Sequence, residues 1–349
     1  MFFMDLKRKV NIFFKYVLIR PRRVINLFLI YLSKFLKLPK VLGFPFTAMI
    51  EPTNYCNLKC PLCPTGQGLI KRKAENLSFE DFKKIMDNLE DTIFHVRLWN
   101  WGEPLLNKDF VKMVKYAKSK KMFVNTSTNS FFLNEKIIKD LIDAKLDQLI
   151  VSLDGASEET YKKYRKKGSF SKVIKALKKA KELKEQRRIK YPEIKLQFIV
   201  MKHNEHEIKK VIKLAKEIGV DTLFFKTLGV MMPEMKKELK KYLPTNKKFR
   251  RYEMYDGKLN EIKLAGRVCD YLWEEVTINV DGSFVPCCRD VHGDYVFGNL
   301  KKQKLKELWN NKKIIEFRKR VLKNKNSIDM CKYCSGSNKE FFISEINLK

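Results

Sequence analysis

Short apolar, β-prone runs alternate with longer amphipathic segments from Pro45 to Pro244, and this alternation constrains the fold more than any other feature of the chain. Such a rhythm is typical of parallel strand–helix units. We expect about six strands, at residues 47–51, 94–99, 122–126, 148–153, 194–200 and 222–226. A helix over residues 79–89 is marked at its start by Ser78 and Asp81, spaced as in a capping box. The pattern predicts an α/β protein.

Three cysteines stand close together after the first predicted strand, in the spacing C-x3-C-x2-C: Cys56, Cys60 and Cys63. Cysteine thiolates hold iron–sulfur cubanes with one ligand for each iron, so three ligands leave one iron open to a small molecule. An open metal position indicates chemistry rather than a structural role. Structural zinc is the alternative, although zinc sites usually use paired C-x2-C elements.

This triplet resembles the signature of the radical S-adenosylmethionine (SAM) superfamily. In that family the open iron binds the amino and carboxylate groups of SAM, and the reduced cluster cleaves SAM to methionine and a 5'-deoxyadenosyl radical, which abstracts hydrogen from the substrate. The resemblance implies that the three cysteines hold a 4Fe-4S cluster bound with SAM, reduced by a donor such as flavodoxin or ferredoxin. Leu62 stands where the family usually has an aromatic residue. The implied fold is a partial (β/α)6 TIM-like barrel over residues 43–245.

Polar motifs follow the predicted strands, at the ends where the loops of an α/β barrel meet at one mouth. The run Trp101-Gly102-Glu103-Pro104 looks like the family's Gly-Gly-Glu-Pro motif, whose backbone and acid receive the SAM ammonium; Trp101 replaces the first glycine. Arg165 resembles the arginine that meets the SAM carboxylate, a task that suits a guanidinium. By resemblance, further polar contacts around SAM come from Ser127, Asn129, Ser152 and Asp154, the last two near the ribose. Strand-end capping, or for Arg165 an exposed surface position, is the alternative role.

Five further cysteines lie beyond Pro244, where the strand–helix rhythm ends, and four of them can close a second metal site. Asp281-Gly282 is a hairpin signal just before the adjacent pair Cys287 and Cys288. The arrangement resembles the family's auxiliary-cluster modules, called SPASM and, in the shortened one-cluster form, twitch, and we assign residues 246–349 to it. No cysteine follows Cys334. The resemblance implies one auxiliary 4Fe-4S cluster on Cys269, Cys287, Cys331 and Cys334, with exchange of Cys287 for Cys288 left open. Structural zinc also fits four thiolates.

Residues 1–42 form a basic and apolar extension that contains ten lysines and arginines but a single acid, Asp5. The longest uncharged stretch, residues 24–33, is about half the length that a membrane-spanning helix needs. Apolar residues recur beside lysines at helical spacing, as in an interfacial helix: Leu27, Ile30, Tyr31, Phe35 and Leu38. We therefore expect amphipathic helices. They either contact a membrane peripherally or pack their apolar face on the catalytic domain.

The composition adds two expectations. The formal charge of +33 suits nucleic acid, anionic lipid or a phosphorylated substrate, although lysines spread over solvated helix faces give the same number. Eight cysteines in 349 residues, without a cleavable signal sequence, favour the reducing cytoplasm, including the cytoplasmic face of a membrane.

These observations predict a radical SAM oxidoreductase or modifying enzyme. Its substrate would be a sugar or cyclitol, a peptide or a lipid, and an oxidative or dehydrogenase-type outcome fits the extra cluster best. The alternative is a basic, zinc-containing nucleic-acid-binding protein without catalysis, although the chain contains no nucleic-acid recognition motif.

Overall fold

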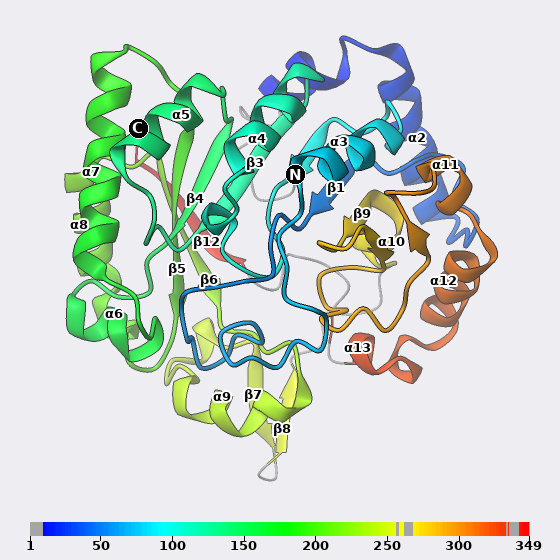
Figure 1. Cartoon of the computed structure of the whole chain (residues 1–349). Helices are drawn as coiled ribbons and strands as arrows, with labels where there is room; N and C mark the ends of the chain where they lie inside the picture. Colours follow the sequence, from blue (N-terminus) through cyan, green and yellow to red (C-terminus); the bar gives the residue numbers. More distant parts are fainter. Residues whose placement is uncertain (1–9, 256–257, 262–267, 333, 335–341, 349) are drawn as a thin grey trace.

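The computed structural model describes residues 10–255, 258–261, 268–332, 334 and 342–348 (Figure 1). Six parallel strands form the centre of its large sheet, in the order β1 to β6. They are β1 (Thr47–Ile50), β2 (His95–Arg97), β3 (Phe123–Thr128), β4 (Gln148–Ser152), β5 (Glu193–Val200) and β6 (Thr222–Thr227). Each strand begins within one residue of its predicted start. The predicted partial (β/α)6 barrel is confirmed.

Helices connect these strands and cover the outside of the sheet (Figure 1). They are α3 (Phe79–Asn88), η2 (Pro104–Leu106), α4 (Phe110–Ser119), α5 (Glu135–Asp143), α6 (Glu158–Tyr164), α7 (Phe170–Gln186), η3 (Glu205–Glu207) and α8 (Ile208–Ile218). The predicted start of α3 is confirmed, because the hydroxyl of Ser78 accepts a hydrogen bond from the amide of Asp81 at 3.1 Å.

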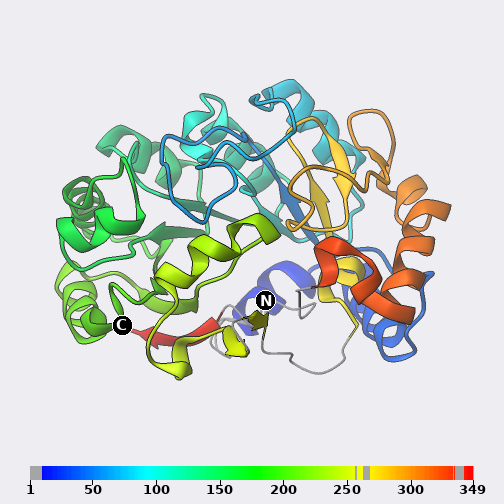
Figure 2. The same ribbon diagram turned by 90° about the horizontal axis from the view of Figure 1, so that it is seen from below.

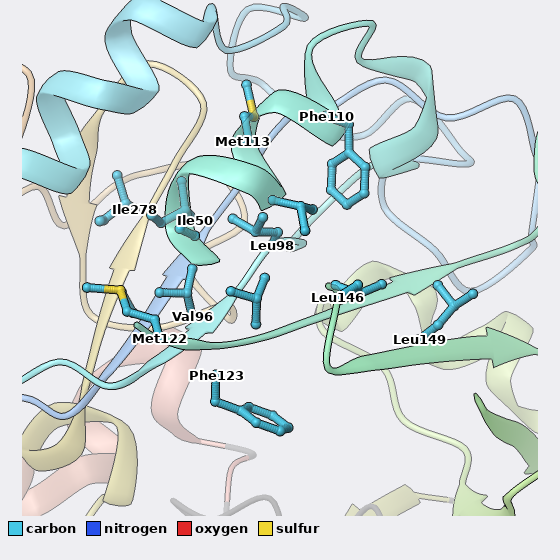
Figure 3. Close-up of a cluster of buried hydrophobic side chains, with 14 of the residues drawn as sticks. Ile50, Val96, Leu98, Phe110, Met113, Met122, Phe123, Leu146, Leu149 and Ile278 are labelled. Atoms are coloured by element: carbon cyan, nitrogen blue, oxygen red, sulfur yellow. The ribbon is translucent and has the colours of Figure 1, made fainter. Parts of the chain in front are cut away.

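Strand alternation sorts side chains between the two faces of the sheet. Val96 and Val124 point outward into the same buried core as Phe110 and Met113 of α4. Figure 3 shows Val96, Phe110 and Met113 in this core. The residues on either side of Val96 and Val124 line a cavity inside the barrel: His95, Arg97, Phe123 and Asn125. The sequence thus places the apolar core outside the barrel strands, and a cavity lined by both polar and apolar side chains inside.

Segments from beyond residue 246 extend the sheet at both edges. β9 (Glu275–Ile278) pairs in parallel with β1, and β10 (Ser283–Val285) and β11 (Gly298–Asn299) follow in antiparallel order. The predicted hairpin joins β9 to β10, and Gly282 in its turn has a φ of +85°, which suits glycine. At the opposite edge, β12 (Phe342–Asn347) pairs antiparallel with β6. The predicted module over residues 246–349 therefore shares its sheet with the barrel.

The remaining described elements lie beside the barrel (Figures 1 and 2). They are η4 (Pro233–Met235), α9 (Lys236–Tyr242), η5 (Lys247–Phe249), β7 (Tyr252–Tyr255), β8 (Lys258–Glu261), α10 (Asp270–Glu274), α11 (Leu305–Leu308), α12 (Lys312–Asn324), η6 (Lys325–Ser327) and α13 (Asp329–Lys332). Two buried indoles tie this region to the end of the N-terminal extension and to the residue that follows it: Trp273 donates to the carbonyl of Leu38 and Trp309 to that of Gly43, both at 2.9 Å.

The N-terminal extension contains η1 (Phe13–Val17) and α2 (Pro21–Phe35) and lies against the amino ends of the parallel strands. Tyr16 donates its hydroxyl to Asp147, just before β4, at 2.6 Å. Buried Arg23 donates to the carbonyl of Ile93, just before β2, at 3.0 Å. Among the described residues, no helix is both long enough and apolar enough to span a membrane.

Candidate active site and cluster sites

A cavity of about 480 Å³ lies inside the barrel. Its wall contains all three cysteines of the first set, together with most of the residues predicted to surround SAM: Gly102, Glu103, Ser127, Asn129, Ser152 and Arg165. Asp154 is fully buried and lies outside this wall. The structure therefore brings together residues that are far apart in the sequence. Asp154 is the one predicted residue that lies behind the wall.

The cysteine loop follows β1, and burial shields the thiols of Cys56 and Cys60 from water. Sγ of Cys56 accepts the amide N–H of Leu58 at 3.4 Å and lies 3.9 Å from Nδ2 of Asn129. Burial raises the pKa of Cys56 to about 11 and that of Cys60 to about 12. A metal must therefore displace protons from these thiols when it binds.

The three thiols fit an iron–sulfur cluster. They line one cavity, and they lie close enough to interact electrostatically, because Cys63 adds to the rise in the pKa of both Cys56 and Cys60. A cubane takes one thiolate for each of its irons, so three neighbouring thiols suit three of them. Cys56, Cys60 and Cys63 would hold such a cluster.

Gly102 is required where the Trp101–Pro104 run crosses the cysteine loop. Its φ is +107°, and a Cβ at this position would lie 2.3 Å from the carbonyl oxygen of Thr53. The next residue, Glu103, donates its amide N–H to the carbonyl of Tyr55 at 2.7 Å. The run therefore lies directly on the loop that carries the cysteines.

Glu103 is buried and joins this run to the end of β3. Its carboxylate accepts the hydroxyl of Thr128 at 2.6 Å and the amide N–H groups of Asn129 at 2.7 Å and Leu105 at 3.2 Å. All three donors are uncharged, and burial raises the pKa of Glu103. The site therefore has a carboxyl group whose negative charge a cation in the cavity would stabilise.

Trp101, the departure from the family motif, faces the cavity and reaches the C-terminal region. Its indole Nε1 donates to the carbonyl of Cys288 at 3.0 Å. Its backbone N–H donates to Oε1 of Glu51 at 3.2 Å. The side chain thus forms part of the cavity wall and links the barrel to the segment that follows β10.

Glu51 is a structural centre of the site that the motif reasoning missed. It is fully buried at the end of β1, and Arg72 donates to both its oxygens, at 2.6 and 2.9 Å. The amide of Val280 donates to it at 2.9 Å. Glu51 therefore fixes the cysteine loop, the Trp101 run and the β9–β10 hairpin relative to one another. An acid at the end of an apolar strand is the only sequence signal, and its partners are distant.

Arg165 and Asp154 form a buried ion pair at the ends of β4 and α6. Nε of Arg165 donates to Oδ2 of Asp154 at 2.6 Å, and the amide of Ile199 donates to Oδ1 at 2.7 Å. Arg165 lines the cavity, so it is not an exposed surface residue. Ser152 also lines the cavity, where Nε2 of Gln197 donates to its hydroxyl at 3.4 Å. Asp154 supports Arg165 from behind.

A series of hydrogen-bonded amide and charged side chains connects neighbouring strands on the inside of the barrel. His95 contacts Asn125 at 3.0 Å, Asn125 donates to Gln148 at 3.2 Å, and Gln148 donates to Glu193 at 3.0 Å. Two ion pairs lie at the sides: Arg97 with Glu275 of β9, and Lys195 with Glu345 of β12, each at 2.9 Å. In the sequence, the signal for these inward-facing groups is their alternation with apolar residues along each strand.

The second cysteine set lies beside the barrel on four short segments. Cys269 precedes α10, Cys287 follows β10, Cys331 lies in α13 and Cys334 follows it. Burial raises the pKa of Cys269, Cys287 and Cys331, the last to about 12, and neighbouring thiolates of the set add to each rise. The four thiols therefore lie near one another and suit a second cluster.

Cys288 differs from its neighbour Cys287. Cys288 lines the barrel cavity, whereas Cys287 is absent from that wall and is buried among the other cysteines of the second set. The two adjacent side chains therefore face different sites: Cys287 the second cysteine set, and Cys288 the barrel cavity.

Comparison with known proteins agrees with this geometry. The chain matches the radical SAM superfamily over residues 50–191 and the SPASM iron–sulfur cluster-binding domain over residues 269–335. It is 24% identical over 309 residues to the tungsten-containing aldehyde ferredoxin oxidoreductase cofactor-modifying protein of Pyrococcus furiosus, covering 77% of this chain and 82% of that protein.

Two further proteins are similar over different extents. The chain is 30% identical over 179 residues to the mycofactocin maturase MftC of Mycolicibacterium smegmatis, which is 51% of this chain and only 43% of that protein. SuiB of Streptococcus suis, solved with its precursor peptide SuiA, superposes with a TM-score of 0.61 at 15% identity, covering 88% of this chain and 73% of SuiB. The structural likeness concerns the fold.

The cysteine loop at the mouth of a partial barrel, with a second cysteine set beside it, defines a SAM-dependent iron–sulfur enzyme. The chain belongs to the radical SAM superfamily and carries a SPASM domain. The predicted family is confirmed. Its cofactors are a 4Fe-4S cluster bound with SAM and auxiliary iron–sulfur in the SPASM domain.

Proposed function

We propose that this chain is a radical SAM oxidoreductase that abstracts hydrogen from a polar substrate inside the barrel. The observation that carries the proposal is the single cavity whose wall contains the three cysteines, Arg165 and the polar inner faces of the strands. When bound to Cys56, Cys60 and Cys63, the cluster supplies the electron that cleaves SAM to methionine and a 5'-deoxyadenosyl radical. A flavodoxin or ferredoxin suits the role of its electron donor.

The residues around the cysteine loop would bind SAM through its charged end. Gly102 lets backbone atoms approach closely, and the buried carboxylate of Glu103 favours the SAM ammonium. Arg165 would pair with the SAM carboxylate through its guanidinium, which Asp154 orients. Ser127, Asn129 and Ser152 supply polar groups around the nucleoside.

The C-terminal cysteines would hold one auxiliary 4Fe-4S cluster, as in a twitch-type module. Cys269, Cys287, Cys331 and Cys334 provide one thiolate for each iron, so this site would have no open position. A fully ligated cluster suits electron transfer rather than substrate binding. It would accept the electron that a substrate radical loses, which supports an oxidative outcome.

The cavity supports a polar substrate over a lipid chain. Two buried ion pairs, Arg97–Glu275 and Lys195–Glu345, reach its wall together with the amides of Asn125 and Gln148. An acyl chain would exclude water from these charged and amide groups and offer them no hydrogen bond, which is unfavourable in a buried site. A sugar, cyclitol or peptide group matches them. The relatives named as a maturase and as a cofactor-modifying protein also support a substrate-modifying reaction.

Anaerobic reconstitution with iron and sulfide, followed by iron counting and a dithionite-driven SAM cleavage assay, tests the proposal. Wild type should bind iron for two cubanes and form 5'-deoxyadenosine. Cys60→Ala should lose the iron of one cluster and all cleavage, while Cys331→Ala should lose the other cluster and keep measurable cleavage. Zinc in place of iron, no cleavage, and salt-sensitive binding to RNA or DNA would instead support the nucleic-acid-binding alternative.

A further inference from the structure

Helix α2 presents its polar side to the protein and its apolar side to the outside. The side chains that face the protein are Arg23, Asn26, Ile30 and Ser33. On the opposite side, the large apolar residues are exposed, with 66% of Phe28 and 82% of Phe35 accessible. The expectation that these helices pack their apolar face on the catalytic domain is therefore wrong for most of α2. Only Ile30 and part of Leu27 pack inward.

Specific hydrogen bonds fix this orientation. Arg23 donates to three backbone carbonyls, those of Tyr16, Asp91 and Ile93. Asn26 donates to the carbonyl of Phe44 and accepts its N–H, both at 2.7 Å. A rotation of α2 that buried its apolar side would break these bonds and leave buried polar groups unpaired, which is unfavourable. The outward apolar face is thus a stable property of the fold.

The exposed apolar surface is large and concentrated. Of the fifteen large apolar side chains that are exposed in the described part of the chain, eleven lie within residues 10–42. They are Val10, Phe14, Leu18, Ile19, Val24, Ile25, Phe28, Tyr31, Phe35, Leu36 and Leu42. An apolar patch of this kind marks a site where the protein meets another apolar surface.

The charges around this patch indicate which surface it meets. Lys15, Arg22, Lys37 and Lys40 are exposed beside it. Aromatic and aliphatic side chains flanked by lysine and arginine are the combination that binds at the interface of an anionic bilayer. A second copy of the same surface would bring like charges together, which is unfavourable. We propose that residues 10–42 bind peripherally to a bilayer that contains anionic lipids.

The position of this surface determines how a bound molecule would be oriented. Tyr16 and Arg23 contact residues just before β4 and β2, so residues 10–42 lie at the amino ends of the parallel strands. The cysteine loop follows the carboxyl end of β1. A bilayer against residues 10–42 therefore lies at the opposite end of the parallel strands from the cysteine loop. The substrate then reaches the cysteine loop from the aqueous side, in agreement with the charged and amide groups of the cavity wall.

Vesicle co-sedimentation of the reconstituted full-length chain tests this proposal. The vesicles are phosphatidylcholine alone and phosphatidylcholine mixed with phosphatidylglycerol. We expect binding to the mixed vesicles, weaker binding to the neutral ones, and at least about a tenfold loss for the double variant Phe28→Ser/Phe35→Ser. Val296→Ser, which removes an exposed apolar side chain from the other region, should bind like wild type. Iron content and SAM cleavage of each variant show that it has folded.

The outcomes distinguish a bilayer from a second copy of the chain as the partner of this surface. Binding that needs both phosphatidylglycerol and the two phenylalanines supports the proposal. Equal binding of wild type and the double variant would overturn it, as would no sedimentation with either vesicle. A concentration-dependent dimer without vesicle binding, abolished by Phe28→Ser/Phe35→Ser, would also overturn it and assign the surface to a second copy of the chain.

Discussion

Nε of Arg165 and Oδ2 of Asp154 lie 2.6 Å apart in a pair that is closed to solvent on the Asp154 side. The amide of Ile199 donates a hydrogen bond to Oδ1, the second carboxylate oxygen of Asp154. A second pair in the barrel repeats this arrangement away from the cavity: Lys184 donates to Asp221 at 2.7 Å, and the amide of Ile194 donates to the same carboxylate at 2.6 Å. The two pairs allow a functional role to be separated from a structural one.

Asp154→Ala should weaken SAM binding at least about tenfold in addition to destabilising the fold by about 3–5 kcal/mol, because it leaves a buried guanidinium without its partner. SAM affinity of the reconstituted protein and denaturant unfolding measure the two effects. Asp221→Ala is the matched control and should lose similar stability while retaining SAM affinity. Equal SAM affinities in the two variants would contradict the role given to Asp154.

Gly102→Ala should nearly abolish SAM cleavage, because its Cβ would collide with the carbonyl oxygen of Thr53 and separate the Trp101 run from the cysteine loop. Gly68 also has a positive φ, +67°, but a Cβ there meets nothing within 4 Å. Gly68→Ala should therefore cost only about 1 kcal/mol of stability and keep its activity. The rate of 5'-deoxyadenosine formation compares the two, and similar rates would show that the close approach at Gly102 is unimportant.

Cys287→Ser should lose the iron of the auxiliary cluster, whereas Cys288→Ser should keep it, because only Cys288 lines the barrel cavity. Iron counting and the cluster spectrum after reconstitution measure this difference. The reverse result would exchange the roles of the two adjacent cysteines.

Lys226→Met should make the fold more stable at pH 7, by up to about 3 kcal/mol. Burial lowers the pKa of Lys226 in the cavity wall from 10.5 to about 8. Below pH 8 the side chain of Lys226 is charged in the folded state, where burial disfavours the charge. As the pH rises from 8 to 10.5, the folded protein binds fewer protons than the unfolded chain, so the wild type gains stability. The difference between variant and wild type should therefore shrink across this window. Denaturant unfolding of both proteins at several pH values measures it, and a constant difference would show that folding does not lower the pKa of Lys226.

The sequence predicted the barrel well because its information is local. Each of the six strands is an apolar run followed by an amphipathic helix, and their starts fall within one residue of prediction. The hairpin that contains β9 was predicted, but the pairing of β9 with β1 and the strand β12 were not, since each joins the sheet beside a strand from a distant part of the chain.

The same limit applies to the site. Motif positions such as Arg165 and Ser152 were found because a resemblance marks them, and both line the cavity. The residues that support the site are Asp154, which pairs with Arg165, and Glu51 with Arg72, which hold the Trp101 run; their roles depend on distances that only the folded chain defines. Ion pairs between residues from different strands, such as Lys195 with Glu345, leave no local trace in a sequence.

The pairing of β12 with β6 also has a consequence for assembly. Residues 342–347 cover the edge of β6, and an uncovered edge strand is prone to join other strands. Glu345 of β12 also pairs with Lys195 and forms part of the cavity wall. A chain in which β12 has not yet joined the sheet therefore has both an open edge strand and a cavity that lacks one wall.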